Sequence, residues 1–316
     1  MSGKSKILKR IGLFITPIVV FVVILFVMPF DKKISYALLR DNCMNRSSWL
    51  HERIFINREP IDIAFIGTSH TIDAIDEDVF RVCLQKQGIE ATPVNMGYCR
   101  MGRNMDYAVI KDLFKHKKPQ YIVLEIREKE NRDGHIDFGY VADGRDVLAP
   151  VLLFNDNIVT DIYNAVVVRM EALKNMIIAR NTVHLTSQAP YKKLPDSTVA
   201  HRAYLEDRKE RNRSWKYATG FSRWFYNQYS FSYIDKIIEL AATNNCKVMF
   251  LYLPEYGSIP TPEEMDFYTV RGKVLLPPAD IYDNPAFWKD HEHTNCMGAQ
   301  TLSQWLATAF REVNPQ

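Results

Sequence analysis

The sequence predicts an α/β protein built on a parallel sheet, with a largely helical insertion and one N-terminal transmembrane helix. Three observations support this fold class. Short apolar runs alternate with amphipathic segments between residues 61 and 126, a pattern typical of right-handed crossovers in a parallel sheet. The alternation resumes at residue 233 after a long interruption, and residues 11–30 carry no charged side chain.

The composition of the 316-residue chain is that of an ordinary globular protein, with 47% hydrophobic and 24% charged residues. Once roughly 30 N-terminal residues are set aside, the length suits one large α/β domain, or one domain with an insertion. The formal net charge is +3, which is too small to indicate a nucleic-acid-binding protein. We therefore expect no nucleic-acid partner.

The apolar run at residues 11–30 is long enough to cross a membrane, because about 20 helical residues span the ~30 Å hydrocarbon core. Basic residues precede it at positions 4, 6, 9 and 10, which favours a cytoplasmic N-terminus. Lys32 and Lys33 reduce this charge asymmetry. A cleaved signal peptide is the alternative, but the run is long for one and no small-x-small cleavage site follows it. We expect residues 1–33 to form a cytoplasmic tail and a single-pass anchor in the cytoplasmic membrane, with the remaining chain outside the cytoplasm.

The cysteines are scattered and include no C-x-x-C motif, so they indicate neither a zinc site nor a dense disulfide framework. One or two disulfides are compatible with an extracytoplasmic location, and the odd count leaves at least one cysteine without a partner in the chain. The five positions are Cys43, Cys83, Cys99, Cys246 and Cys296.

Residues 34–60 are expected to be a partly helical linker that ends at Pro60. The domain (residues 61–316) then begins with alternating strands and helices, with a glycine after the first two strands and the first helix. Acidic residues in the first turn of the first helix suit its dipole. The expected elements are strand Ile61–Ile66, helix Asp76–Gln87, strand Thr92–Met96, helix Met105–His116 and strand Tyr121–Ile126.

An insertion from about residue 132 to 225 interrupts the alternation. Residues 147–179 have helical apolar spacing, 187–196 resemble a loop, and 202–216 are a dense charge run. The charge run predicts a solvated helix face, the alternative being a basic surface for a membrane or an anionic polymer. We expect the insertion to cap or shape the site. The pattern then resumes with helix Tyr233–Asn245, strand Lys247–Leu253, a short strand Val274–Leu276 and a last helix Gly298–Phe310.

Ser69 follows the first predicted strand, at the edge where ligands bind in parallel sheets. Gly67 lets the backbone expose the residues after it. A turn or N-cap role is the structural alternative for this serine. The turn is not a G-x-S-x-G elbow, because Thr71 occupies the second glycine position. His70 is adjacent to Ser69, and since adjacent side chains usually diverge, we do not expect it to be the base.

Asp290 and His293 lie three residues apart before the last helix, in the motif D-x-x-H-x-N-x-x-G. One short turn can present both side chains on one side, so that the aspartate orients the imidazole and the imidazole takes the serine proton. The non-functional alternative is a surface loop in which the histidine and the aspartate are incidental. His291 and Glu292 give a metal alternative, but no second ligand cluster accompanies them, so no metal is expected.

An acyl intermediate needs donors for its oxyanion, and the backbone N–H groups of Ser69 and Gly97 are candidates at neighbouring strand ends. Four further polar residues lie near this edge, and a structural or substrate-facing role is the more frequent one for each. Arg127 is the residue we expect to contact an anion or the oxyanion. The four are Asn95, Arg100, Asn104 and Arg127.

In these residues the chain resembles the SGNH/GDSL superfamily of serine esterases and acyltransferases. The resemblance rests on Gly67-Thr-Ser69, on Asn95-Met-Gly97, and on the motif from Asp290 to Gly298. It covers residues 61–130 and 233–312. Thr68 replaces the usual aspartate of the first block, and the third block, Gly-x-Asn-Asp, is absent.

The resemblance implies a three-layer flavodoxin-like fold and no cofactor, with Ser69 as nucleophile, His293 as base and Asp290 as its orienter. Anchored members are similar to the D-alanyl transfer protein of teichoic-acid modification and to alginate O-acetylation proteins, which implies a membrane-bound O-acyltransferase as partner. The expected function is acyl transfer or ester hydrolysis on an envelope polysaccharide. The alternative is a non-catalytic scaffold with the same fold.

Overall fold

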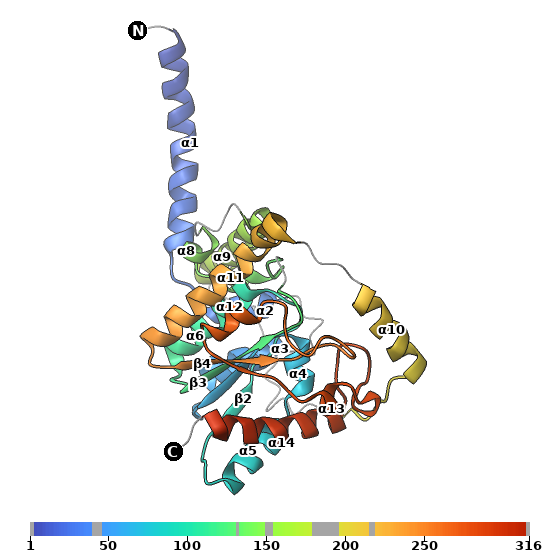
Figure 1. Ribbon diagram of the computed structural model, residues 1–316. Helices are drawn as coiled ribbons and strands as arrows, with labels where there is room; N and C mark the ends of the chain where they lie inside the picture. The colour runs from blue at the N-terminus through green and yellow to red at the C-terminus, as the bar shows by residue number, and fades with distance from the viewer. Residues whose placement is uncertain are drawn as a thin grey trace.

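The computed structural model describes residues 3–39, 46–130, 133–148, 154–178, 196–214 and 219–313. It contains a five-stranded, fully parallel sheet in the order β2-β1-β3-β4-β5 (Figure 1), which is the order of flavodoxin-like sheets. Each predicted strand is confirmed to within two residues. The strands are β1 (Ile63–Ile66), β2 (Pro93–Asn95), β3 (Tyr121–Ile126), β4 (Lys247–Tyr252) and β5 (Lys273–Leu275).

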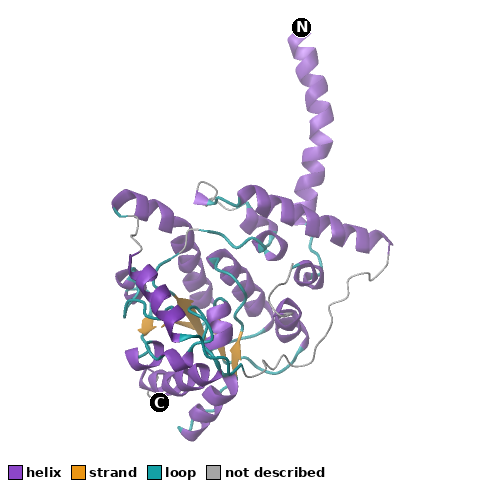
Figure 2. Cartoon of the chain, turned by 90° about the vertical axis from the view of Figure 1, so that its right-hand side faces the viewer, coloured by secondary structure: helices purple, strands orange, loops and turns teal. Residues whose placement is uncertain are grey.

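Helices cover both faces of the sheet, which explains why its strands are almost continuously apolar. On one face, α6 (Arg103–His116) and α11 (Gly220–Thr243) pack over the side chains of Ala64 and Ile66. On the other face, α5 (Glu77–Lys86) and α14 (Cys296–Val313) pack over Ile63 and Phe65. Figure 2 shows the strands enclosed between these helical layers. The expected α/β class with a parallel sheet is confirmed.

The segment after the anchor, expected to be a partly helical linker, contains helices and packs into the domain. It forms α2 (Lys32–Leu38), α3 (Arg46–His51) and a π-helical turn (Glu52–Ile56). Tyr36 and Leu50 are fully buried in the main core, in the same cluster as residues of the sheet and of α6. The chain therefore passes from the anchor directly into the packed domain.

The insertion is divided between two places. Helices α8 (Gly144–Val147) and α9 (Ile158–Ile178) contact α1 (Gly3–Val27), and α7 (Phe138–Val141) packs against α9. The charge run forms α10 (Arg202–Ser214), which lies apart from them beside the last part of the chain (Figure 1). The expected loop at residues 187–196 lies outside the described residues except for Asp196. The remaining elements are α4 (Ser69–Ala74), α12 (Met265–Thr269), α13 (Ala279–Tyr282) and a 3-10 turn (Pro285–Phe287).

Two helices differ in length from the expectation. The helix predicted over residues 147–179 is shorter, since α9 begins at Ile158, whereas α11 begins at Gly220 rather than Tyr233. The first turns of α11 carry aromatic side chains on their exposed side. An apolar exposed face obscures the helical period on which the prediction depended.

Within the described residues, α1 is the single helix long and apolar enough to cross a membrane, with a candidate span of 19 residues from Lys9 to Val27. Only 6% of this span is buried inside the protein. Among the cysteines, Cys99 is disulfide-bonded, whereas Cys83, Cys246 and Cys296 are free. Cys43 lies outside the described residues.

Candidate active site

Ser69 is the first residue of α4, immediately beyond the carboxyl end of β1. Thr68 caps this helix, and its hydroxyl oxygen accepts the His70 N–H at 3.1 Å. Ser69 itself is partly exposed, whereas the residues on both sides of it are buried. The N–H of a first helical residue has no acceptor within its own helix, so the Ser69 backbone presents a donor beside its own hydroxyl.

The buried carboxylate of Glu125, on β3, holds the turn that carries Ser69. It accepts the Thr68 N–H at 2.7 Å and the Thr71 N–H at 3.2 Å. It also accepts the Thr68 hydroxyl at 2.9 Å and the Thr71 hydroxyl at 2.5 Å. Gly67 is required here, because a Cβ at this position would collide with the carboxylate. Glu125 thus fixes the backbone on both sides of the serine.

The loop that carries His293 is a tight hairpin. Trp288 and Thr294 pair as an antiparallel bridge, and the Lys289 N–H donates to the His293 carbonyl at 3.0 Å. Asn295 then caps α14, because its side-chain oxygen accepts the Gly298 N–H at 3.1 Å. These contacts give the spacing of residues in the D-x-x-H-x-N-x-x-G motif a local structural reason.

Two contacts join this hairpin to the serine helix. The Thr294 hydroxyl donates to the Asp73 carbonyl at 3.0 Å, and the Lys289 ammonium lies 3.0 Å from the Asp73 carboxylate. The Asp73 side chain is almost completely buried. These contacts hold the hairpin in a fixed position against α4, although the two segments are more than two hundred residues apart in the sequence.

Ser69, His293 and Asp290 form a continuous hydrogen-bonded chain. The Ser69 Oγ lies 2.9 Å from Nε2 of His293. The Nδ1 atom of the same ring lies 3.0 Å from both carboxylate oxygens of Asp290. This is the geometry in which a carboxylate orients an imidazole and the imidazole removes a hydroxyl proton. All three side chains predicted as catalytic are brought together.

Asp290 is held as an anion. Its Oδ1 accepts the backbone N–H groups of Glu292 and His293, each at 2.8 Å. Burial acts to raise the pKa of Asp290, but the hydrogen bonds with His293 and with these amides lower it to about 2. The carboxylate is therefore available across the neutral pH range to stabilise an imidazolium at His293.

His70 packs against His293 and is not part of the hydrogen-bonded series formed by Ser69, His293 and Asp290. Its ring is buried and packs edge-on against that of His293, with ring centroids 5.3 Å apart. Burial, together with the charges of Arg127 and His293, lowers the pKa of His70 well below its ordinary value. A neutral His70 packs against the His293 ring without adding a competing positive charge.

The hydrogen bonds of Asn95 and Gly97 differ from our expectation. The Gly97 N–H donates to the Asn95 side-chain oxygen at 3.1 Å, so this amide is not free to hold an oxyanion. The Asn95 amide group donates to the carbonyls of Thr71 and Ile75, at 2.7 and 3.1 Å. Asn95 therefore closes the carboxyl end of α4, since the last helical carbonyls need external donors.

Arg127 is close to the site but already paired. Its guanidinium lies 2.5 Å from the Glu255 carboxylate, which also accepts the Asn212 amide of α10 at 2.8 Å. The hydrogen bond with His291, together with the nearby charge of Arg127, lowers the pKa of Glu292. Arg127 thus belongs to a polar rim beside the hairpin.

Helix α10 completes this rim. The Tyr204 hydroxyl lies 2.7 Å from Nδ1 of His291, and the Arg208 guanidinium contacts Nε2 of the same ring. Leu205 is fully buried beside Tyr256 and Trp288. The second part of the insertion therefore covers one side of the hairpin that carries His293.

Two groups of side chains in the described residues have the spacing of metal ligands, namely His70 with Glu292 and His293, and Glu255 with His291 and Glu292. The first contains the imidazole already hydrogen-bonded to Ser69. The second is interleaved with the guanidinium groups of Arg127 and Arg208. Positive charges at hydrogen-bonding distance from the donor atoms oppose cation binding.

The remaining polar residues at this edge have different surroundings. Asn104 is completely buried, and its amide donates to the Tyr229 hydroxyl at 3.1 Å. Arg100 is exposed and has a left-handed backbone, with φ of 69°. Neither is linked to the hydrogen-bonded chain of Ser69.

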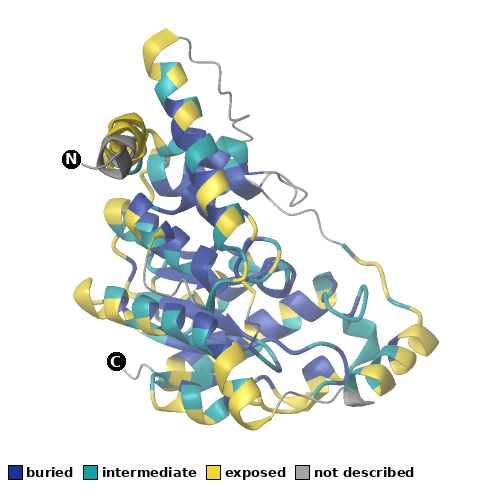
Figure 3. Cartoon of the chain, turned by 90° about the horizontal axis from the view of Figure 1, so that it is seen from above, coloured by how far each residue is buried: buried dark blue, intermediate teal, exposed yellow. Residues whose placement is uncertain are grey.

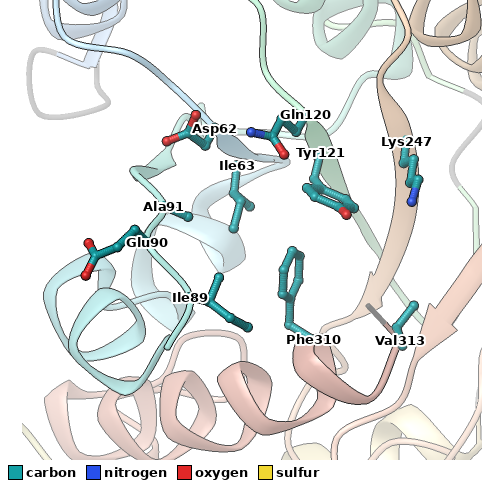
Figure 4. Close-up of a pocket in the computed structure, with 10 residues that line it drawn as sticks. All are labelled: Asp62, Ile63, Ile89, Glu90, Ala91, Gln120, Tyr121, Lys247, Phe310 and Val313. Carbon is teal, nitrogen blue, oxygen red and sulfur yellow. The ribbon is translucent and has the colours of Figure 1, made fainter. Parts of the chain in front are cut away.

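A hollow of about 440 Å³ lies at the opposite end of the sheet (Figure 4). It is lined by Ile63 and Tyr121 at the strand starts and by Phe310 of α14. Substrates of parallel α/β sheets bind at the carboxyl ends of the strands. We therefore locate the candidate site at the Ser69 edge, where Ser69 meets Asp290 and His293 from a distant part of the chain.

No protein-family model matches this chain, and no curated protein sequence matches it either. The interpretation of the site therefore depends on its geometry.

Sequence reasoning missed Glu125, Asp73 and Lys289. Glu125 carried a usable signal, because a carboxylate inside an otherwise apolar buried strand needs several hydrogen-bond donors. The pairing of Asp73 with Lys289 had no local signal, since it depends on how the two ends of the domain meet.

Proposed function

We propose that this chain is a membrane-anchored, extracytoplasmic SGNH-type enzyme that transfers or hydrolyses an acyl group through an acyl-serine intermediate. The observation that carries the proposal is the hydrogen-bonded chain from Ser69 through His293 to Asp290. A non-catalytic scaffold would not need a serine, an imidazole and a carboxylate in this alignment. The contacts of Glu125 with the serine turn and of Asp73 with the hairpin hold these residues in place, which supports the same proposal.

In the proposed reaction, the Ser69 Oγ attacks the carbonyl carbon of an ester while Nε2 of His293 takes the hydroxyl proton. The Asp290 carboxylate stabilises the imidazolium that results, and the Ser69 N–H donates to the oxyanion. Collapse of the tetrahedral intermediate releases the alcohol, which receives its proton from His293. An acceptor hydroxyl, or water, then attacks the acyl-serine with His293 again as base.

The proposed substrate is an acylated envelope polysaccharide, and a membrane-bound O-acyltransferase is the proposed partner. Two features support an extracytoplasmic location in the cytoplasmic membrane: the apolar α1 preceded by basic residues, and the disulfide at Cys99. Arg127 is paired with Glu255 on the rim beside the hairpin, and we propose that it exchanges this partner for an anionic group of the substrate.

The test is intact-mass spectrometry of the full chain in detergent micelles after treatment with a fluorophosphonate. Wild type should gain one adduct, and Ser69→Ala should gain none. Ser303→Ala is the matched control, because Ser303 is fully buried on α14 and donates no group to the site; it should label like wild type. Equal labelling of Ser69→Ala and wild type, or no labelling of a folded wild type, would reject the nucleophile and favour the scaffold.

A further inference from the structure

Helix α9 has an inverted distribution of polar residues. Its buried face includes Asp161, Asn164 and Arg169. Its outward stripe, by contrast, is apolar over the whole length of the helix, at the three- and four-residue spacing of one helical face. The stripe consists of Val159, Ile162, Tyr163, Val166, Met170, Leu173 and Ile177, of which all but Val166 and Leu173 are exposed.

The start of α11 extends this apolar surface. Phe221 is 76% exposed and Trp224 is 53% exposed. Phe154, just before α9, contacts both Trp224 and Phe225, with ring centroids 6.5 and 5.2 Å apart. The aromatic residues of α11 and the stripe of α9 therefore belong to one surface, which we call the α9–α11 face.

This face lies at the foot of α1. Figures 2 and 3 show α9 lying across the axis of α1, and Figure 1 places it on the side of the domain from which α1 emerges. The junction is packed rather than loose. The buried guanidinium of Arg169 lies 4.9 Å from the ring centroid of Phe26 and 5.1 Å from that of Phe30.

A second contact fixes the same junction. The Lys32 ammonium, just after the anchor, lies 3.2 Å from Asp112 and 3.3 Å from Asp143. Because the domain is joined to α1 through these contacts, the orientation of α1 determines which surface of the domain faces the bilayer. A helix that lies across α1 at its foot runs along the membrane surface.

The geometry points to a lipid surface as the occupant of the α9–α11 face: the outer leaflet of the membrane that α1 crosses. Trp and Tyr side chains at the level of the headgroups, with aliphatic side chains below them, are typical of interfacial segments. Lys174 borders the stripe and is exposed, so its ammonium group can reach the headgroup region. The inference rests on the proposed anchoring by α1, and the experiment below distinguishes the two.

The experiment measures quenching of tryptophan fluorescence by a phosphatidylcholine brominated near the headgroup end of its acyl chains. The full chain is reconstituted in vesicles of this lipid. Helix α1 contains no tryptophan, so quenching reports on the domain. Wild type should be quenched, and Trp224→Phe should lose most of this quenching. Trp305→Phe, on α14 at the far side of the domain (Figure 1), should not.

A second variant tests α9 itself. Tyr163→Trp in the Trp224→Phe background should recover the quenching, because Tyr163 is exposed within the stripe. Equal quenching of wild type and Trp224→Phe, in vesicles that retain the protein after an alkaline wash, would overturn the inference and leave the anchor intact. Loss of the protein in that wash would reject the anchor as well. Cross-linking between copies through Met170→Cys, without lipid quenching, would assign the face to a second copy of the chain and overturn the lipid assignment.

Discussion

Replacement of Glu125 by glutamine should lower the reactivity of Ser69, although Glu125 makes its hydrogen bonds with Thr68 and Thr71 and not with Ser69. The substitution preserves size but converts one acceptor oxygen into a donor, whereas the carboxylate now receives four donors from Thr68 and Thr71. At least one buried donor then loses its acceptor, which costs about 1–3 kcal/mol. At about 2–4 °C per kcal/mol for large domains, the melting temperature should fall by roughly 2–12 °C.

The effect on reactivity should be larger than this loss of stability suggests. The displaced turn carries Ser69 away from His293, and a displacement of about 1 Å can slow a positioned reaction by roughly 100-fold. We expect fluorophosphonate labelling of Glu125→Gln to be slower by about 10- to 100-fold at a temperature where the variant is folded. Rates are measured by intact mass against time, and folding by thermal unfolding monitored by circular dichroism.

The matched control is Asp112→Asn. Asp112 is equally buried, but it lies on α6 and pairs with Lys32 and Lys115, each at 3.2 Å. This variant should lose stability and label at the wild-type rate. Labelling of Glu125→Gln at the wild-type rate would refute the positioning role. An equal decrease in Asp112→Asn would show that general destabilisation, rather than the serine turn, controls the rate.

Three further outcomes are expected. Asp290→Asn should slow labelling by about 100- to 10,000-fold, measured at a temperature where the variant is folded, because His293 loses its orienting anion; a rate within twofold of wild type would exclude that role. Gly67→Ala should lower the melting temperature by several degrees and abolish labelling, since its Cβ collides with Glu125; normal labelling would contradict the close approach. Burial raises the pKa of Asp161 to about 6, so its protonated form favours folding below about pH 4, and this contribution is lost as the pH rises through 6. Asp161→Asn should therefore be more stable than wild type at pH 8, and not at pH 4, in thermal unfolding; equal stability at both values would contradict the raised pKa.

The sheet was predictable because its strands are short, apolar and separated by glycine or proline. Tyr121–Ile126 was located to the residue. Right-handed crossovers make the strands parallel. Ser69 directly follows the first strand, so it must lie at the edge of the sheet where the strands have their carboxyl ends. The D-x-x-H spacing placed Asp290 and His293 in one turn. The meeting of Ser69 with His293 and Asp290 therefore follows from local patterns together with a single rule of topology.

Other features depend on contacts that no local pattern contains. The Gly97 amide was expected at the oxyanion, but the neighbouring Asn95 side chain accepts it. Which of two nearby acceptors an amide meets is decided by rotamers and packing. Likewise, the sequence predicts a partly helical linker at residues 34–60, whereas Tyr36 and Leu50 are buried in the core of the domain. Their partners come from α6 and the sheet, which are distant in the sequence.

The packed junction between Arg169 and the rings of Phe26 and Phe30 has a consequence for the search for substrates. A catalytic domain on a flexible tether explores a hemisphere whose radius grows with the tether, and its effective concentration at any point falls accordingly. A domain packed rigidly against its anchor can only rotate about the membrane normal and diffuse laterally in the plane of the membrane. Under the proposed function, an acyl donor within the same membrane would meet Ser69 by planar diffusion, whereas a chain far out in the envelope would have to come to the bilayer.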